Sequence, residues 1–343
     1  MSTFTPSRPA GPIRGRVLVA EDETLIRLDI RAALEKKGWD VCGEARDGGE
    51  AVRLVRGLEP DVALLDLKMP GIDGVEATRR IHGARNTPVV MMTAYDRPSS
   101  LARSIVAGAT EYVVKPFVED ELDRAVARAA SGASPLASPT GERDHAAAPP
   151  RRAEIIAAAK QLFATNGYDA TSIQRLADEV GLLKGSLYYH IASKEELLTM
   201  AVAGFLNASA AVLRYAQEAG GSPRRRLQRF VSARRALHLY DWQGSTIVAS
   251  SSRSLREAEV GRMLSDAAAM DTQFLVDLLS AGERGGAFRL SGEPTQVARS
   301  ILDVVAGAPA AAGRSQSLSG LAIDDDANAC AAFVLAAVGS DRS

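Results

Sequence analysis

The spacing of apolar residues changes character along the chain. Between positions 16 and 130, short apolar runs alternate with longer stretches in which apolar residues recur every third or fourth position. Short runs bounded by turn residues predict buried strands, and the periodic stretches predict amphipathic helices. The predicted strands cover 16–20, 40–45, 62–66, 89–92 and 112–114, and the predicted helices cover 25–37, 49–57, 75–82, 99–107 and 119–130. This alternation predicts a doubly wound, flavodoxin-like α/β fold whose five-stranded parallel sheet is covered by helices on both faces.

Polar side chains follow the ends of these predicted strands. Glu21 and Asp22 end the first strand, Asp66 the third, Thr93 the fourth and Lys115 the fifth. Ligand chemistry in such folds lies beyond the carboxyl ends of the strands. Crowded carboxylates repel one another unless a cation joins them, and oxygen ligands with room for water suit Mg²⁺. A lysine and a threonine beside such a site suit an anion bound to Asp66, so the pattern indicates phosphoryl transfer onto a carboxylate.

These residues stand in motifs of a known family. EDE, LLDLKMPGIDG, MMTAY and YVVKPF occur in the order and spacing of receiver domains of two-component response regulators, which residues 16–130 resemble. The resemblance implies that a sensor histidine kinase phosphorylates Asp66, that Lys115 pairs with the phosphoryl oxygens, and that the Lys115–Pro116 bond is cis. Thr93 and Tyr112 would form the conformational switch. Mg²⁺ would be held by Glu21, Asp22, Asp66 and the backbone carbonyl of Lys68.

Two segments lack periodicity. Residues 1–15 are rich in Pro, Gly, Ser and Arg, which favours a disordered leader. Residues 131–150 read SGASPLASPTGERDHAAAPP, a small, proline-rich composition that is typical of a linker.

Residues 151–200 have a different pattern, with apolar residues at helical spacing throughout. A first helix runs to Asn166, where Asn-Gly favours a left-handed end, and Thr171 or Ser172 offers an N-cap for a second helix. A turn at Gly181 leads to a third helix over 184–190, and Ser193 can cap a fourth. Two short helices joined by a glycine turn predict a helix-turn-helix, whose second helix enters the major groove of DNA.

The run GLLKGSLYYHIASKEELL within this segment resembles the DNA-binding domain of TetR-family transcriptional regulators. Leu183 departs from the Ser or Thr that is usual in the family, and Ile191 replaces its usual Phe. The resemblance implies double-stranded DNA as partner and a set of DNA-contacting residues: Thr171, Lys184, Gly185, Ser186, Tyr188, Tyr189, His190 and Lys194.

The remainder, residues 201–343, is predicted to be all-helical. Helices are expected over 197–215, 224–239, 255–264, 271–281, 295–305 and 326–338, with a loop over 308–320. The TetR resemblance implies a homodimer in which the last two helices pair with those of a second subunit. It also implies a candidate small-molecule cavity, for which Trp242, Met263, Met270 and Phe274 are apolar candidates, although plain core packing is the favoured role for each of them.

Composition limits the remaining choices. The formal net charge is -1 over 343 residues, so a DNA-binding surface requires segregated charge rather than overall basicity. Cys42 and Cys330 are too distant in sequence to suggest a disulfide framework, and the four histidines show no metal-ligand spacing. The sequence shows no apolar run of about 18 residues, which leads us to expect a cytoplasmic protein without a membrane segment.

Together the patterns predict a phosphorylation-responsive, DNA-binding transcriptional regulator rather than a metabolic enzyme. One alternative is a small-molecule-sensing TetR-type repressor whose receiver is vestigial. Another is a phosphate sink or scaffold whose helix-turn-helix no longer binds DNA. Labelling by acetyl phosphate separates the first alternative from the main hypothesis, and operator binding separates the second.

Overall fold

The computed structural model describes residues 14–84, 87–93, 97–131, 150–218, 220–254, 258–307 and 319–339. Most of the predicted leader and most of the predicted linker lie outside these ranges. The chain divides into two compact units. The first comprises Met1–Asp96 and Ala107–Ala147, and the second comprises Arg97–Val106 and Ala148–Ser343.

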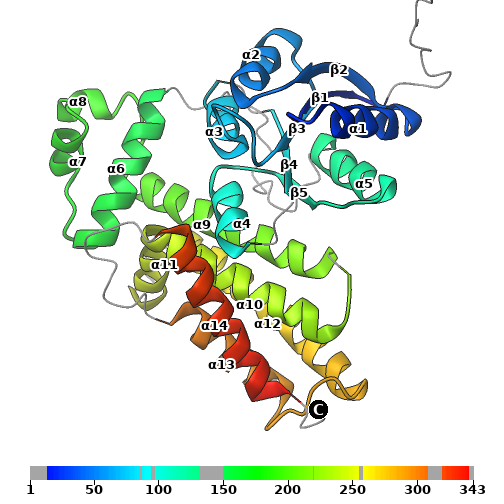
Figure 1. Cartoon of the computed structure of the whole chain (residues 1–343). Coiled ribbons are helices and arrows are strands. Elements are labelled where there is room, and N and C mark those ends of the chain that lie inside the picture. The colour runs from blue at the N-terminus through cyan, green and yellow to red at the C-terminus, as the bar shows by residue number, and fades with distance from the viewer. Residues whose placement is uncertain are drawn as a thin grey trace, which may run out of the picture. The chain divides into compact units, whose positions relative to one another are not determined.

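The first unit contains the predicted parallel sheet, which the structure confirms (Figure 1). Its strand order is β2-β1-β3-β4-β5. The strands are β1 (Arg16–Ala20), β2 (Asp40–Ala45), β3 (Val62–Asp66), β4 (Val89–Thr93) and β5 (Glu111–Val114). Strands β1, β3 and β4 consist almost entirely of buried residues, as expected for a parallel sheet whose centre is shielded on both faces.

Two apolar layers hold helices against this sheet. On one face, α1 (Thr24–Lys36) and α5 (Glu119–Ala130) pack on Val17, Val19 and Leu64. On the other, α2 (Gly48–Leu58) and α3 (Gly74–Ala84) pack on Leu18, Ala20 and Leu65. Successive strand residues alternate between the two layers because strand side chains point to opposite faces.

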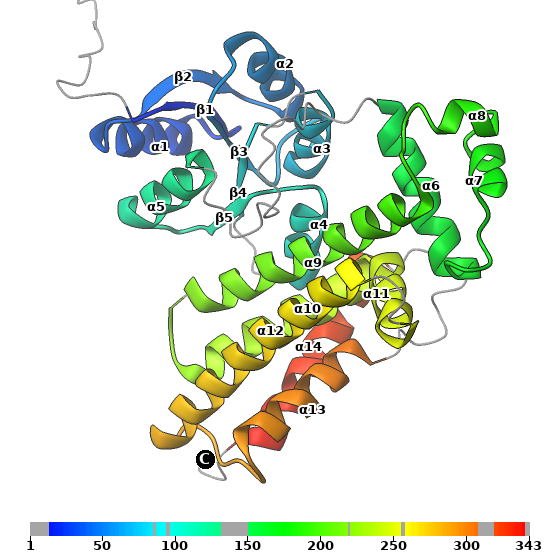
Figure 2. The ribbon, with the colours of Figure 1, turned by 180° about the vertical axis from the view of Figure 1, so that it is seen from behind.

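The second unit is all-helical, and Figure 2 shows its long helices from behind. Its N-terminal part holds α6 (Pro150–Asn166), α7 (Ile173–Glu179) and the short α8 (Lys184–Leu187). The long part holds α9 (Lys194–Glu218), α10 (Pro223–Tyr240), α11 (Trp242–Ser254), α12 (Ala258–Arg284), α13 (Pro294–Ala306) and α14 (Gly320–Val338).

Most of the predicted helix boundaries near the helix-turn-helix are confirmed. Ser172, rather than Thr171, caps α7 by accepting a hydrogen bond from the Arg175 amide at 3.1 Å. Ser193 accepts from the Glu196 amide at 3.1 Å at the start of α9, and Gly167 adopts a positive φ of 86° after α6. The helix expected over 184–190 is shorter, because α8 ends at Leu187.

Two predictions for the long helices were wrong. The predicted helices 255–264 and 271–281 are not separate, because the described residues 258–264 and 271–281 belong to one continuous helix, α12. Alanines and an exposed Met270 between them propagate a helix without needing burial. The sequence analysis also missed α11, whose serine-rich sequence has low helix propensity. Tertiary packing stabilises α11 instead, since Ile247 is buried in the core shared with α6 and α9.

The candidate cavity residues do not converge on one space. Phe274 packs on Phe230 with ring centroids 5.2 Å apart, whereas Met263 packs in a different cluster together with residues of α6 and α7. Met270 is half exposed. Their positions fit the core-packing interpretation of these side chains.

Buried ion pairs tie the helices of this unit together. Arg234 of α10 makes a two-pronged contact with Asp271 of α12, at 2.6 and 2.8 Å. Lys160 of α6 lies 2.6 Å from Asp241, a buried residue at the end of α10. An unpaired charge in the interior is costly, so the Arg234–Asp271 pair holds α10 against α12 and the Lys160–Asp241 pair holds α6 against the end of α10.

An apolar window within α9 was not expected from the sequence. Residues Lys194–Gln217 are long and apolar enough to cross a membrane by length and composition, with a mean hydropathy of 1.6. However, 56% of the window is buried among the other helices, as in a core helix of a globular domain. The finding is therefore weak evidence for a membrane segment.

Helix α4 (Pro98–Val106) departs from the predicted arrangement. In sequence it connects β4 to β5, but by its contacts it belongs to the helical unit, where it packs on α9, α10 and α14. The compact units thus differ from the predicted receiver boundaries of 16–130 by this one helix.

Candidate functional site

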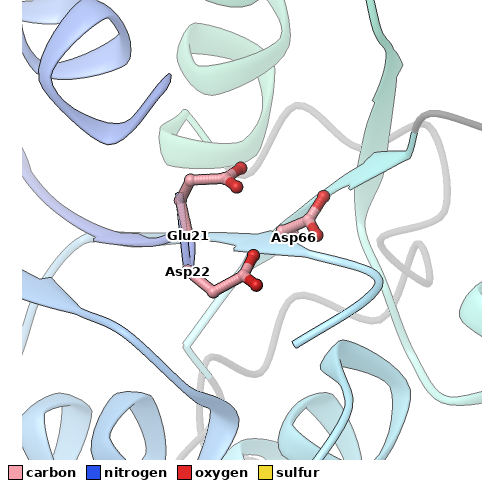
Figure 3. A group of neighbouring side chains, drawn as sticks. All are labelled: Glu21, Asp22 and Asp66. Carbon is pink, nitrogen blue, oxygen red and sulfur yellow. The ribbon is translucent and has the colours of Figure 1, made fainter. Parts of the chain in front are cut away.

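The acidic residues predicted at the sheet edge do come together. Glu21 and Asp22 directly follow β1, and Asp66 is the last residue of β3, the strand beside β1. Figure 3 shows the three carboxyl groups at this edge, and each offers an oxygen within 4.8 Å of the others. Glu21 and Asp66 are buried, whereas Asp22 is exposed.

Lys115 occupies the gap between the two buried carboxylates. Its ammonium donates to Glu21 Oε2 at 2.5 Å and to Asp66 Oδ1 at 2.8 Å. Burial raises the pKa of Glu21 above its ordinary value, and the hydrogen bond from Lys115 offsets only part of that rise. Burial also opposes the charge on Lys115, but the carboxylates outweigh it and raise the pKa of the ammonium. The lysine therefore supplies the positive charge that these carboxylates require.

The other carboxylate oxygen of Asp66 contacts the loop that follows β3. Asp66 Oδ2 accepts a hydrogen bond from the Lys68 amide at 3.1 Å. The loop returns close to β3, because the Gly74 amide donates to the Leu67 carbonyl at 3.0 Å. A side chain at Gly74 would lie 2.3 Å from the Asp66 carbonyl oxygen, so only glycine fits there. The sequence analysis missed this glycine, although LLDLKMPGIDG contains it.

The two predicted switch residues lie on neighbouring strands of the same sheet. Thr93 ends β4 and is buried, and Tyr112 of β5 is half-buried against the cluster beneath α2 and α3. In the strand register Thr93 pairs with Val114 and Met91 pairs with Tyr112. The Lys115–Pro116 peptide bond is cis, as the resemblance implied.

The acidic cluster satisfies the chemistry of a Mg²⁺ site. It offers carboxylate oxygens on one side, with exposed Asp22 leaving room for water ligands. Glu21, Asp22 and Asp66 would hold the ion, together with the Lys68 carbonyl. A bound Mg²⁺ would offset negative charge on the carboxylates and on phosphoryl oxygens.

The second predicted site is the helix-turn-helix formed by α7 and α8. The turn between them passes through Gly181 with a φ of 65°, and Leu187 is fully buried and anchors α8 to the core. The opposite side of α8 faces solvent: Tyr189 is 90% exposed, Tyr188 is 49% exposed, and Lys184 and Gly185 are also exposed. Ser186 and His190 are partly exposed beside them.

Two of the predicted DNA-contact residues have internal partners. Thr171 is fully buried, and its hydroxyl donates to the carbonyls of Leu162 and Gly167. The expected DNA contact through this hydroxyl is therefore corrected to a role in the turn before α7. Lys194 lies over the Tyr168 ring at 4.1 Å from its centroid and remains partly exposed, so its charge stays near the surface at the start of α9.

Leu183, which stands where the family usually has Ser or Thr, changes how α8 begins. Leu183 is the N-cap residue of α8, makes no side-chain cap hydrogen bond, and is 79% exposed. Ser or Thr at this position would cap the helix, so α8 begins here without that stabilisation.

Comparison with known families matches both sites. Residues 17–127 match the family model described as response regulator receiver domain. Residues 155–200 match the model described as bacterial regulatory proteins, tetR family.

The curated relatives align with the first unit. The chain is 41% identical over 127 residues to the transcriptional regulatory protein PdtaR of Mycobacterium tuberculosis, a match that covers 37% of this chain and 62% of PdtaR. It is 38% identical over 117 residues to the regulatory protein AtoC of Escherichia coli, covering 33% of this chain and 25% of AtoC. The chain thus spans less than two thirds of these relatives.

A solved structure aligns with the second unit. The ketosteroid transcriptional regulator KstR2 of Mycobacterium tuberculosis is 27% identical, with a TM-score of 0.51, over 56% of this chain and 96% of that one. The similarity therefore extends beyond the helix-turn-helix into the long helices.

The acidic cluster predicts a Mg²⁺-dependent gain in stability. Mg²⁺ at about ten times its Kd should stabilise the sheet unit by about 1.4 kcal/mol and raise its unfolding midpoint, an effect that chelation should reverse. Asp22→Asn should abolish the Mg²⁺ response, whereas Asp29→Asn, which changes an exposed aspartate on α1, should retain it. Thermal unfolding followed by circular dichroism measures the response. An unchanged response in Asp22→Asn would exclude this cluster as the metal site.

Proposed function

Since the chain joins a response regulator receiver domain to a TetR-family DNA-binding domain, we propose that it is a transcriptional regulator controlled by phosphorylation of Asp66. The observation that carries the proposal is the contact of Lys115 with Glu21 and Asp66. This contact holds the buried carboxylate of Asp66 beside the positive charge of Lys115 at the carboxyl edge of the sheet. The same chain presents an exposed recognition helix, α8.

The chemistry at Asp66 is transfer of a phosphoryl group from a phosphohistidine of a sensor kinase. A carboxylate oxygen of Asp66 forms a bond to phosphorus, the P–N bond breaks, and the imidazole leaves with the electron pair. Lys115 keeps its proton and pairs with the negative phosphoryl oxygens. The Lys68 amide donates to Asp66 Oδ2, so the new group is received next to a backbone amide.

The signal leaves the site through β4 and β5. In the proposed mechanism Thr93 moves to hydrogen-bond the phosphoryl group, and Tyr112 follows into the space that Thr93 leaves. The half-buried position of Tyr112 against the α2 and α3 layer supports this, since its ring is not fully enclosed by the core. Phosphorylation then shifts DNA affinity to the extent that the phosphoryl group favours one of the two arrangements of Thr93 and Tyr112 over the other.

DNA binding is assigned to the exposed side of α8 and the start of α9. Lys184, Tyr188 and Tyr189 reach bases or phosphates, and Lys194 approaches a phosphate from the partly exposed surface beside Tyr168. Gly185 allows close approach of the backbone, and Ser186 and His190 border the same surface. One helix this short reads few base pairs, so a palindromic operator bound by two copies would supply useful specificity.

The second copy is proposed to bind at the groove between α13 and α14. Val304 and Phe333 line this groove and are 39% and 63% exposed, an unusual position for large apolar side chains. Ser300 and Ala337 are small neighbours that allow close helix approach. A four-helix bundle with a second copy would cover this surface. We place the protein in the cytoplasm, where it can contact both its operator and the kinase domain. A small-molecule ligand bound by the helical unit would be an additional signal.

Asp66 is predicted to be the sole phosphoacceptor. Wild-type protein incubated with acetyl phosphate and Mg²⁺ should shift on a phosphate-affinity gel, and Asp66→Asn should not, because the amide is not a nucleophile. Asp29→Asn provides the matched control with one carboxylate lost from an exposed helix position. Equal labelling of wild type and Asp66→Asn would refute the assignment.

Lys184 is predicted to contact DNA without stabilising the fold. Lys184→Ala should weaken operator binding by ~1 kcal/mol or more and flatten the log–log salt dependence by about one unit. Arg284→Ala removes an equal charge from the exposed far end of α12 and should leave both quantities unchanged. Fluorescence anisotropy over a salt series measures them, and thermal unfolding should be the same for all three proteins. A wild-type affinity and salt slope in Lys184→Ala would contradict the placement of α8 on DNA.

Phe333 is predicted to lie in the dimer interface. Phe333→Glu should convert a dimer into a monomer at micromolar concentration, since it buries a charge without a partner. Leu25→Glu changes a side chain that is 77% exposed on α1 and should leave the dimer intact. Light scattering reports the mass. A dimeric Phe333→Glu would place the interface elsewhere.

A further inference from the structure

Helix α4 is largely buried. Six of its nine residues are buried, whereas Arg103 is exposed. The buried set is Pro98, Ser99, Leu101, Ala102, Ser104 and Ile105. A helix that buries most of its residues against one set of neighbours has to release them before it packs on another surface.

The helix lies against α10 and α14. The contact has a specific polar anchor, because Oδ1 of Asp324 on α14 accepts a hydrogen bond from the Ser99 amide at 2.8 Å. Amides in the first turn of a helix have no partner within the helix, and negative charge is favoured there. Asp324 is itself buried, at 7% exposure. A buried carboxylate thus caps α4 from a helix that is distant in sequence.

The sheet offers α4 a second surface. A right-handed β4–α4–β5 crossover would place the helix on the same face as α2 and α3. On that face of β5, Tyr112 and Val114 are only half-buried, whereas Glu111 and Val113 on the other face are buried. The half-buried strip is where α4 would lie if it packed on its own sheet.

We propose that α4 exchanges between these two surfaces: it docks on α10 and α14 under the Asp324 cap while Asp66 is unmodified, and it moves to the sheet beside Tyr112 when Asp66 is phosphorylated. The docking follows from contacts within the helical unit, and the dependence on phosphate rests on the proposed function. Thr93 ends β4 and Pro98 begins α4, so a movement of Thr93 reaches α4 through a short connection. The α13–α14 groove remains open while α4 is docked, because Phe333 and Val304 are still exposed.

A designed disulfide tests the docked position. A Cβ added at Gly320 would lie 4.0 Å from the Ser99 Cβ, within the 3.5–4.5 Å range of disulfides. In a background carrying Cys42→Ala and Cys330→Ala, the pair Ser99→Cys and Gly320→Cys should close on mild oxidation. The matched pair Ser100→Cys and Gly320→Cys should close much more slowly, since Ser100 is not one of the buried residues. Non-reducing gels separate intrachain from interchain products, and an interchain product or no product overturns the docking.

The same protein tests the exchange. Acetyl phosphate with Mg²⁺, added before the oxidant, should slow disulfide formation roughly tenfold. Adding Asp66→Asn should remove that effect while leaving the disulfide itself. If a phosphate-affinity gel shows modified protein and the rate is unchanged, the exchange is overturned and the phosphorylation proposal stands. If the protein is not modified at all, the phosphorylation proposal fails, and the phosphate dependence of α4 fails with it. Disulfide formation then still tests the docking of α4 by itself.

A second measurement covers the Asp324 cap without cysteines. Asp324→Ala should speed amide hydrogen exchange across residues 98–106 roughly tenfold relative to wild type. Asp325→Ala, which changes the exposed neighbour on α14, should leave that exchange unchanged. Equal exchange in the two variants would overturn the role of Asp324 as the anchor of α4.

Discussion

The structure depends on the neutralisation of buried negative charge at one edge of a parallel sheet. Glu21 and Asp66 are both buried, and two carboxylates at this distance would repel one another without a cation. Lys115, at the end of β5, lies between them, so the strands that carry these residues are held in register by their charges as well as by their ladders. The second oxygen of Asp66 accepts from the Lys68 amide, and the exposed carboxylate of Asp22 lies beside it.

The helical unit manages charge differently. Its buried arginines are paired, as in Arg234 with Asp271, and these pairs connect the long helices without facing solvent. On the helix-turn-helix, one anchor, Leu187, holds α8 on the core, while Lys184 on α8 and the two tyrosines that follow it are exposed. A balanced overall charge is therefore compatible with a DNA-binding surface, because the paired charges do not take part in it.

The sequence predicted the parallel sheet, the strand-end cluster and the helix-turn-helix because each depends on local patterns: apolar runs, motif spacing and capping residues. It did not predict α11, whose serines disfavour a helix that only tertiary burial of Ile247 stabilises. It assigned Thr171 to DNA because a hydroxyl before a helix can face either way, and the buried carbonyl of Leu162 accepts it here. The docking of α4 depends on Asp324, which is more than two hundred positions away in the sequence. Local sequence patterns do not predict contacts between residues this far apart.

The central claim is that the phosphorylation state of the sheet unit changes the DNA affinity of the helical unit. Operator duplexes selected from random sequence with the full chain allow the most direct measurement, the Kd at fixed salt with and without acetyl phosphate and Mg²⁺. The account predicts a change of about fivefold or more for wild type and none for Asp66→Asn. Equal affinities in wild-type protein shown to be phosphorylated would contradict it.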